Sequence, residues 1–300
     1  MKESFIERNF SSSSMNTIDL VNGILNEYGQ QGYKLSLRQL YYQMVSRDYI
    51  PNTQRSYKNL GSLVSNARQA GLVDWEMIED RNRETNSLSH WLNPAQIVQS
   101  AAEQFRIDKW KDQPYHIEVM VEKDALSGVL LPVCQRLDVG ITANKGYSSS
   151  STMYEIGKRL QNYFKQGKTI TVIYLGDHDP SGIDMSRDVQ ERLQLYSQVD
   201  SIEFVRVALN FDQVKELKPP ENPAKESDAR YGAYVRKYGR SSWELDAVEP
   251  VRLATLVRDA VVKRRDNKLW EKAIHRQEDM REELKAFVEQ YNNNQSGEDE

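Results

Sequence analysis

HIEVMVEK at positions 116–123 and TITVIYLGDHDPSGIDM at positions 169–185 are the two stretches that decide the fold. Each begins with an apolar, β-branched run typical of a buried strand, and acidic residues follow both runs. Two further runs, ITANKG and SIEFVRVAL, have a similar character. Helix-like stretches lie between the runs, at about 124–137, 151–166 and 184–197. Strand–helix alternation of this kind predicts an α/β domain with a mainly parallel sheet.

Three acidic side chains come at the ends of the two deciding stretches. Glu122 ends the first run, and Asp177 and Asp179 follow the second. Carboxyl ends of parallel strands are where α/β sheets place their chemistry, and positions i and i+2 of an extended chain point the same way. Three carboxylates there would make a hard-oxygen pocket suited to Mg²⁺, which stabilises charge on a phosphate. The alternative is that Asp-x-Asp only forms a turn or caps the helix that begins around Pro180 and Gly182.

The chain before this domain predicts three helices. The first covers about 16–30, the second begins after the capping residue Ser36 in LSLRQLYYQMVSRDYI, and the third covers about 55–70. LVDWEMIEDR, which follows, alternates like a strand. Three helices followed by a β wing are typical of a winged-helix domain, a helix-turn-helix variant that binds DNA. We therefore expect a winged-helix domain over residues 1–110.

The α/β domain is expected to extend over residues 113–300, after a connecting helix at about 92–112. Its last part is rich in predicted helix, at about 249–263 and 266–291. The final residues, NNNQSGEDE, are polar and acidic, so a disordered tail is expected.

The composition is that of a globular protein, with 39% apolar and 28% charged residues. There is no run of about 18 apolar residues, so no membrane span is expected. The N-terminus lacks the apolar core of a signal peptide. The single cysteine, Cys134, excludes an internal disulfide and a Cys-rich zinc site. These features together favour a cytoplasmic protein.

Basic residues are concentrated in one part of the chain, although its formal net charge is −4. Segment 34–68 holds six basic residues and one acid, Asp48. Such a local excess is the electrostatic signature of a surface that contacts phosphates, here those of double-stranded DNA. The candidate DNA-contacting residues are Arg38, Arg47, Arg55, Lys58 and Arg68.

VEKDAL and GDHDPSGIDM together resemble the Toprim domain. The similarity is to its version in topoisomerase VI A subunits and in the related meiotic double-strand-break protein. That family has a strand-end Glu followed by Asp-x-Asp-Pro-x-Gly-Ile, and the resemblance implies that Glu122, Asp177 and Asp179 bind the metal. NKGYSSSS resembles the family's Gly-aromatic-Pro loop, with Ser148 in place of the proline. His178, between the two aspartates, is expected to point away from them and not to be a ligand.

A late acidic segment, WELDAVEP, also resembles a part of the same domain. Its acids Glu244 and Asp246 either assist the site or cap the helix after Pro250, and we expect the cap. The resemblance covers about 34–83 and 115–260.

In that family a tyrosine on the winged-helix domain cleaves DNA. The family motif is Arg-x-hydrophobic-(Tyr/Phe)-Tyr, so LRQLYY implies that Arg38 and Tyr42 are the catalytic residues. Helical periodicity places Tyr41 on the apolar stripe and Tyr42 beside Arg38. We expect Tyr41 in the core and Tyr42 at the polar surface, where Arg38 would stabilise a phenolate or orient the phosphate. The alternative is that Tyr42 only packs at the edge of its domain.

The predicted function is Mg²⁺-dependent DNA strand cleavage by tyrosine transesterification, as in the A subunit of a type IIB topoisomerase. A double-strand break needs two copies, so the resemblance implies a homodimer in which Tyr42 meets the partner's Glu122. The chain has no Gly-rich phosphate loop, so ATP-driven strand passage would need a separate ATPase subunit. The chain also resembles the compact A-subunit-like proteins of bacteria and phages that have no obvious ATPase partner.

Three alternatives remain open. The first is a Toprim endonuclease that uses metal-activated water, as in phage or defence systems. The second is a catalytically inactive DNA-binding protein, against which the presence of all three acids counts. The third is a primase, against which the absence of a zinc module counts.

Overall fold

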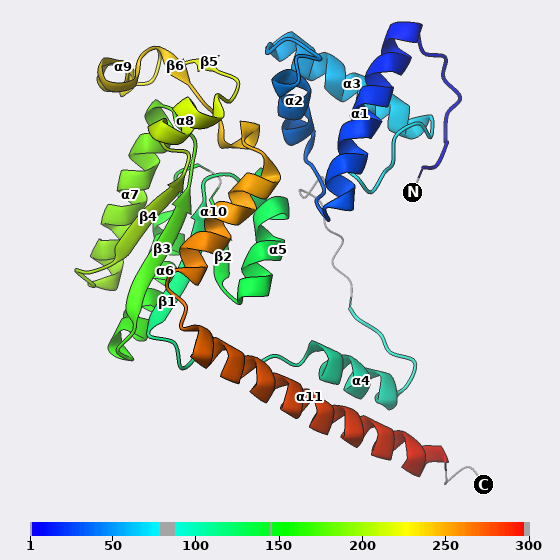
Figure 1. The fold of residues 1–300 in the computed structure, drawn as a ribbon, viewed down its shortest axis with the longest axis vertical. Helices are drawn as coiled ribbons and strands as arrows, with labels where there is room; N and C mark the ends of the chain where they lie inside the picture. Colours follow the sequence, from blue (N-terminus) through cyan, green and yellow to red (C-terminus); the bar gives the residue numbers. More distant parts are fainter. Residues whose placement is uncertain (1, 79–87, 145, 297–300) are drawn as a thin grey trace.

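A four-stranded parallel sheet forms the centre of the larger part of the molecule (Figure 1). The computed structural model describes residues 2–78, 88–144 and 146–296. The strand order is β2-β1-β3-β4, and the α/β class predicted from the sequence is confirmed. The strands are β1 (Tyr115–Val121), β2 (Gly140–Ala143), β3 (Thr169–Leu175) and β4 (Glu203–Ala208).

Helices cover both faces of this sheet, because its central strands are apolar on both sides. Ile117, Val119 and Val121 of β1 point to one face, where α5 (Ser127–Leu137) and α10 (Pro250–Val262) pack. Met120 points to the other face. There α6 and α7 complete a second core. Their bounds are Ser150–Lys165 and Pro180–Ser197.

Short elements after β4 were not expected from the sequence. They bring the late acidic segment back to the carboxyl edge of the sheet, because β6 leads directly into η2. In chain order they are α8 (Phe211–Leu217), β5 (Asn222–Pro223), α9 (Tyr231–Tyr238), β6 (Ser241–Ser242) and η2 (Leu245–Ala247). A further short element, η1 (Asp124–Leu126), joins β1 to α5.

The N-terminal part contains the three predicted helices, α1 (Ser12–Gln30), α2 (Leu37–Ser46) and α3 (Gln54–Gln69). Ser36 and Gln39 form a reciprocal capping box at the start of α2, in which Ser36 Oγ accepts from the Gln39 N–H and Gln39 Oε1 accepts from the Ser36 N–H. The apolar stripe of α2 lies in the core of these three helices, as predicted.

The β wing expected after α3 is not formed over residues 72–78. The Asp74 side chain accepts a hydrogen bond from the Glu76 N–H at 2.8 Å, and this local turn breaks the extended chain. Only an isolated bridge between Leu35 and Ile78 is present. The rest of the expected wing, 79–81, lies outside the described residues. The structure therefore shows three helices here without establishing a winged-helix domain.

The connecting helix and the C-terminal end also differ from expectation. The connector is helical only in α4 (Pro94–Gln104), which packs against the long helix α11 (Asn267–Ser296) (Figure 1). The tail expected to be disordered from residue 292 continues α11 to Ser296, and residues 297–300 lie outside the described part. No helix among the described residues is both long and apolar enough to span a membrane.

Candidate active site

The ends of β1 and β3 bring Glu122 and Asp177 together. Val121 and Leu175 are register partners, so the two strands end level and Glu122 lies beside the chain that leaves β3. The backbone N–H of Asp177 donates to Glu122 Oε2 at 2.8 Å. The two acids thus lie at one edge of the sheet, although they lie 55 residues apart in sequence.

Two glycines make room for the Glu122 carboxylate. A Cβ at Gly176 would lie 2.6 Å from Glu122 Oε2, and a Cβ at Gly182 would lie 3.0 Å from the same oxygen. At Gly182 it would also lie 2.5 Å from the carbonyl oxygen of Asp177. Any larger residue at either position would therefore displace the carboxylate or the loop.

Asp179 has a different role from Asp177. It is the N-cap of α7, where its Oδ1 accepts from the Gly182 N–H at 2.6 Å and from Ser181 Oγ at 3.1 Å. The Asp177 carboxylate instead accepts from the Leu245 N–H at 2.8 Å. The helix cap considered as the alternative for Asp-x-Asp thus describes Asp179, and the two carboxylates bind different groups.

Lys123 lies at the point where several carboxylates meet. Its Nζ is 2.6 Å from Asp177 Oδ2 and 2.6 Å from Glu244 Oε2. A third carboxylate oxygen, Oδ2 of Asp246, lies 3.1 Å away. Burial alone would lower the pKa of this ammonium, but the surrounding carboxylates, first Asp177, raise it, so Lys123 is charged.

The expectation that Glu244 and Asp246 cap α10 is wrong. The N-cap of that helix is Glu249, whose side chain makes no capping hydrogen bond. His178 and Trp243 exchange two backbone hydrogen bonds of 2.8 and 3.0 Å. This pairing places the residues that follow Trp243 beside the loop that carries Asp177. This long-range pairing turns both acids toward Lys123.

Two carboxylates of the acidic site, those of Glu122 and Asp177, lie in an environment that disfavours their charge. Burial raises the pKa of Glu122 from 4.5 to about 8, and the neighbouring Asp177 carboxylate adds to the shift. Burial also raises the pKa of Asp177, against the opposing effect of Lys123. A further cation near Glu122 would favour the charged forms of both acids.

Arg206, a residue of β4, binds the backbone of the acidic loop, the segment after β3 that carries Asp177 and Asp179. Its guanidinium donates to the carbonyl oxygens of Gly176 at 2.9 Å, Asp177 at 2.5 Å, Gly182 at 3.2 Å and Leu209 at 3.3 Å. It therefore ties the ends of β3 and β4 to the first turn of α7. Sequence reasoning missed Arg206; the only signal was a basic residue inside the otherwise mostly apolar predicted strand SIEFVRVAL.

Arg38 connects α2 to the acidic site. Its guanidinium donates to both carboxylate oxygens of Glu244, and its Nε lies 3.7 Å from Asp246 Oδ2. Glu244 in turn binds Lys123, which binds Asp177. One chain of ion pairs therefore extends from the N-terminal helices to the strand end.

The expectation that Tyr42 lies at the polar surface is wrong, because the side chain is only 3% exposed. The face of α2 that turns away from the three-helix core is covered by the α/β part. Asn222 Nδ2 donates to the Tyr42 hydroxyl at 3.3 Å, and the Arg38 guanidinium lies 6.0 Å from the ring centre. Burial raises the pKa of Tyr42 to about 12, with a further contribution from Glu244. Nothing in the sequence around Asn222 signalled this contact.

Tyr41 lies in the core as predicted. Its hydroxyl donates to Asn52 Oδ1 at 2.9 Å and to the Thr53 carbonyl oxygen at 3.2 Å. The hydroxyl is therefore satisfied within its own part of the molecule.

The five candidate DNA contacts divide into two groups. Arg38 is engaged by Glu244, Arg47 pairs with Glu27 at 2.8 Å, and Arg68 stacks on Trp75 at 4.5 Å. The other two, Arg55 and Lys58, are exposed on α3.

No protein-family model, curated protein or solved structure matches this chain.

His178 points away from the acids into an aromatic cluster. Its ring contacts those of Phe211, Tyr234, Tyr238 and Trp243, and its Nδ1 lies 2.9 Å from the Tyr234 hydroxyl oxygen. Burial lowers the pKa of His178 to about 4, so the ring is neutral. Its role here is packing.

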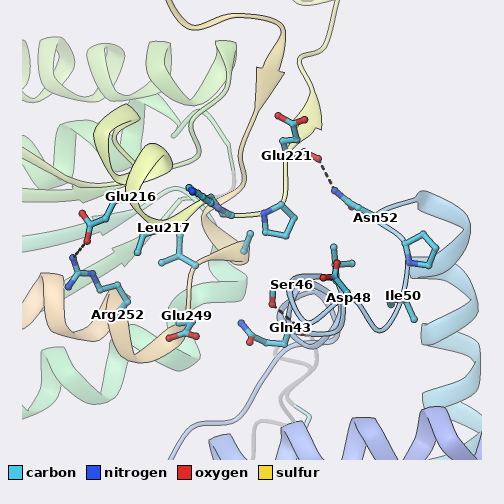
Figure 2. Close-up of a pocket in the computed structure, with 17 residues that line it drawn as sticks. Gln43, Ser46, Asp48, Ile50, Asn52, Glu216, Leu217, Glu221, Glu249 and Arg252 are labelled. Atoms are coloured by element: carbon cyan, nitrogen blue, oxygen red, sulfur yellow. Dashed lines mark hydrogen bonds and ion pairs between the residues drawn. The ribbon is translucent and has the colours of Figure 1, made fainter.

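A cleft of about 830 Å³ lies between the end of α2 and the segments before β5 and at the start of α10 (Figure 2). Asn52 Nδ2 bridges its rim by donating to the Glu221 carbonyl oxygen at 2.8 Å, and Arg252 pairs with Glu216 at 3.4 Å. The predicted metal-binding acids are not among the lining residues.

The donors at the acidic site suit Mg²⁺ chemically, since all are carboxylate oxygens. In the described ranges, however, no three His, Cys, Asp or Glu side chains stand in an arrangement that could hold a metal ion. The Lys123 ammonium lies where three of the carboxylates meet. Asp246 Oδ1 is buried and has no hydrogen-bond partner among the described residues.

Proposed function

We propose that this protein cleaves DNA strands in a Mg²⁺-dependent reaction in which Tyr42 is the nucleophile, as in the A subunit of a type IIB topoisomerase. The α/β part would be a Toprim domain and the N-terminal part a winged-helix domain. The supporting observation is the continuous set of ion pairs from Arg38 through Glu244 and Lys123 to Asp177, because it joins the tyrosine helix to the acidic strand end.

The residues have distinct roles in this proposal. Glu122 and Asp177 would hold Mg²⁺, which when bound stabilises negative charge on the phosphate. Tyr42 gives up its phenolic proton to solvent and its oxygen bonds to phosphorus, while the bond from phosphorus to the 3′ oxygen breaks and that oxygen takes up a proton from solvent. Arg38, beside Tyr42, would stabilise charge on the phenolate and the phosphate.

DNA would lie across the exposed side of α3, where Arg55 and Lys58 are available for phosphate contacts. A double-strand break needs two tyrosines, so the active form would be a homodimer. Strand passage driven by ATP would require a separate ATPase subunit.

The burial of Tyr42 favours a second candidate, a Toprim endonuclease in which metal-activated water attacks the phosphodiester. At 3% exposure the hydroxyl cannot reach a phosphate unless α2 moves away from Asn222. A water nucleophile needs no such movement.

The deciding experiment incubates the protein with supercoiled plasmid and Mg²⁺, denatures the products and tests for protein attached to 5′ ends. We expect covalent attachment in the wild type and neither cleavage nor attachment in Glu122→Ala and Asp177→Ala. Glu155→Ala, an exposed position on α6, is the control and should cleave normally. Cleavage without attached protein would favour the endonuclease, and no cleavage under any condition would favour a DNA-binding protein.

A further inference from the structure

We propose that α9 and the segments beside it form a second DNA-contacting surface, which binds the phosphate backbone of the same duplex as α3. This surface, the α9 surface, consists of four exposed basic side chains: Lys225, Arg236, Lys237 and Arg240. The inference rests on the proposed function, since it concerns the same DNA. It adds a contact from the α/β part to those expected from the N-terminal helices.

The charge of residues 224–243 is the first argument, because this segment is basic in a chain whose formal net charge is −4. It holds five basic residues and two acids, Glu226 and Asp228. Arg230 pairs with Asp228 at 3.1 Å and with Asp184 at 2.8 Å. Within the segment, only Glu226 is then left to balance the four basic residues of the α9 surface.

The side chains of the α9 surface are also free to bind an anion. None of the four makes an ion pair or a hydrogen bond with another residue in the part of the chain that the structure describes. Lys237 Nζ only lies over the Tyr238 ring, 5.0 Å from its centre. In contrast, Arg159 and Arg264 of the α/β part each bind a carboxylate. A phosphate can therefore bind the α9 surface without first breaking an ion pair.

Aromatic contacts hold α9 against the acidic loop. The Tyr234 hydroxyl donates to the carbonyl oxygen of His178, the residue between the two aspartates, at 2.9 Å. The Tyr238 ring meets the His178 ring edge-on, with ring centres 4.6 Å apart. The helical period places Arg236 on the side of α9 opposite Tyr234. The buried side of α9 thus fixes its basic side close to the acidic loop.

The α9 surface and the exposed basic residues of α3 lie at the same end of the molecule (Figure 1). Their two supports are in direct contact, because Asn52, just before α3, binds the start of β5. Its Nδ2 donates to the carbonyl oxygen of Glu221 at 2.8 Å and to Asn222 Oδ1 at 3.1 Å. We expect a duplex bound to Arg55 and Lys58 to continue across this junction onto the α9 surface.

A salt titration of the affinity for a fluorescently labelled duplex tests the inference. EDTA is present, so that cleavage does not intervene. We expect Arg236→Ala/Lys237→Ala to reduce the slope of log affinity against log salt by about 2, since each phosphate contact contributes about 0.9. The matched control, Lys272→Ala/Arg276→Ala, removes the same charges from an exposed part of α11, at the other end of the molecule (Figure 1), and should keep the wild-type slope.

The outcomes separate this inference from the proposed function. If the wild type binds no DNA, both fail together. If the wild type binds DNA and only Arg55→Ala/Lys58→Ala reduces the slope, the α9 surface fails alone. A slope that falls equally in the α11 control would also overturn the inference, because it would show a general effect of net charge.

A crosslinking experiment tests the same surface by position instead of affinity. The single cysteine, Cys134, is buried, so a new surface cysteine can be modified selectively. Lys237→Cys carrying a photoactivated aryl azide should become covalently attached to the duplex on irradiation. Lys272→Cys with the same group is the control and should attach far less. Equal attachment from the two positions would contradict the assignment of the α9 surface.

Discussion

Replacing Glu122 by Gln should stabilise the metal-free protein at alkaline pH. Burial raises the pKa of Glu122 from 4.5 to about 8, so folding favours its protonated form. The stability that this group contributes is fully present below pH 4.5 and is lost as pH rises through 8. Glutamine is neutral throughout, nearly isosteric, and its carbonyl oxygen can still accept from the Asp177 N–H.

The size of the effect follows from the difference between the two pKa values of Glu122, 4.5 and about 8. At about 1.4 kcal/mol per pH unit, the interval from 4.5 to 8 sets a ceiling of about 5 kcal/mol. We expect Glu122→Gln to exceed the wild type by about 2–5 kcal/mol at pH 9 and by much less at pH 5.

Urea unfolding in EDTA at the two pH values, at constant ionic strength, measures this difference. Glu155→Gln on exposed α6 is the control and should stay within about 0.5 kcal/mol of the wild type. A Glu122→Gln advantage that is equal at pH 5 and pH 9 would refute the argument that buried charge is the cause.

Three further predictions concern the reaction and its partners. Tyr42→Phe should abolish cleavage and covalent attachment, and the lost hydrogen bond should lower the free energy of unfolding by about 0.5–1.5 kcal/mol. Tyr41→Phe should still cleave plasmid DNA. The reverse pattern in a plasmid assay would exclude Tyr42 as nucleophile. The double variant Arg55→Ala/Lys58→Ala should reduce the slope of log affinity against log salt by about 2 in a DNA titration, whereas an unchanged slope would mean that α3 is not the docking face. Light scattering should find a dimer with DNA and Mg²⁺ bound, and double-strand breaks made by a strictly monomeric protein would contradict this.

Local patterns predicted the four strands of the parallel sheet and the first three helices. The apolar runs around Val119 and Ile173 form central strands because both of their faces are buried, and this needs no knowledge of distant contacts. Ser36, expected as the N-cap, marked the start of α2 in the same way, and the structure confirms it. The meeting of Glu122 with Asp177 was also expected, since it follows from parallel strands that end level.

Contacts between distant segments were not predictable in this way. Helical periodicity places Tyr42 off the apolar stripe, but it cannot say that Asn222, 180 residues away, will cover it. Glu244 and Asp246 precede a proline that begins a helix, so a cap was the nearest local explanation. Their true partner, Lys123, lies more than 120 residues earlier and is reached only because β6 leads back to the strand ends.

The four carbonyl contacts of Arg206 have a thermodynamic consequence for any ligand of the acidic loop. A flexible loop loses about 1–2 kcal/mol of backbone entropy for each residue that a ligand orders. Here the guanidinium fork already fixes the chain at Gly176, Asp177 and Gly182, so this entropy was lost when the protein folded. Ligand affinity at the loop is thus determined mainly by desolvation and by electrostatic interactions. A variant that lacks the Arg206 hydrogen bonds would bind the same ligand with a larger entropic penalty.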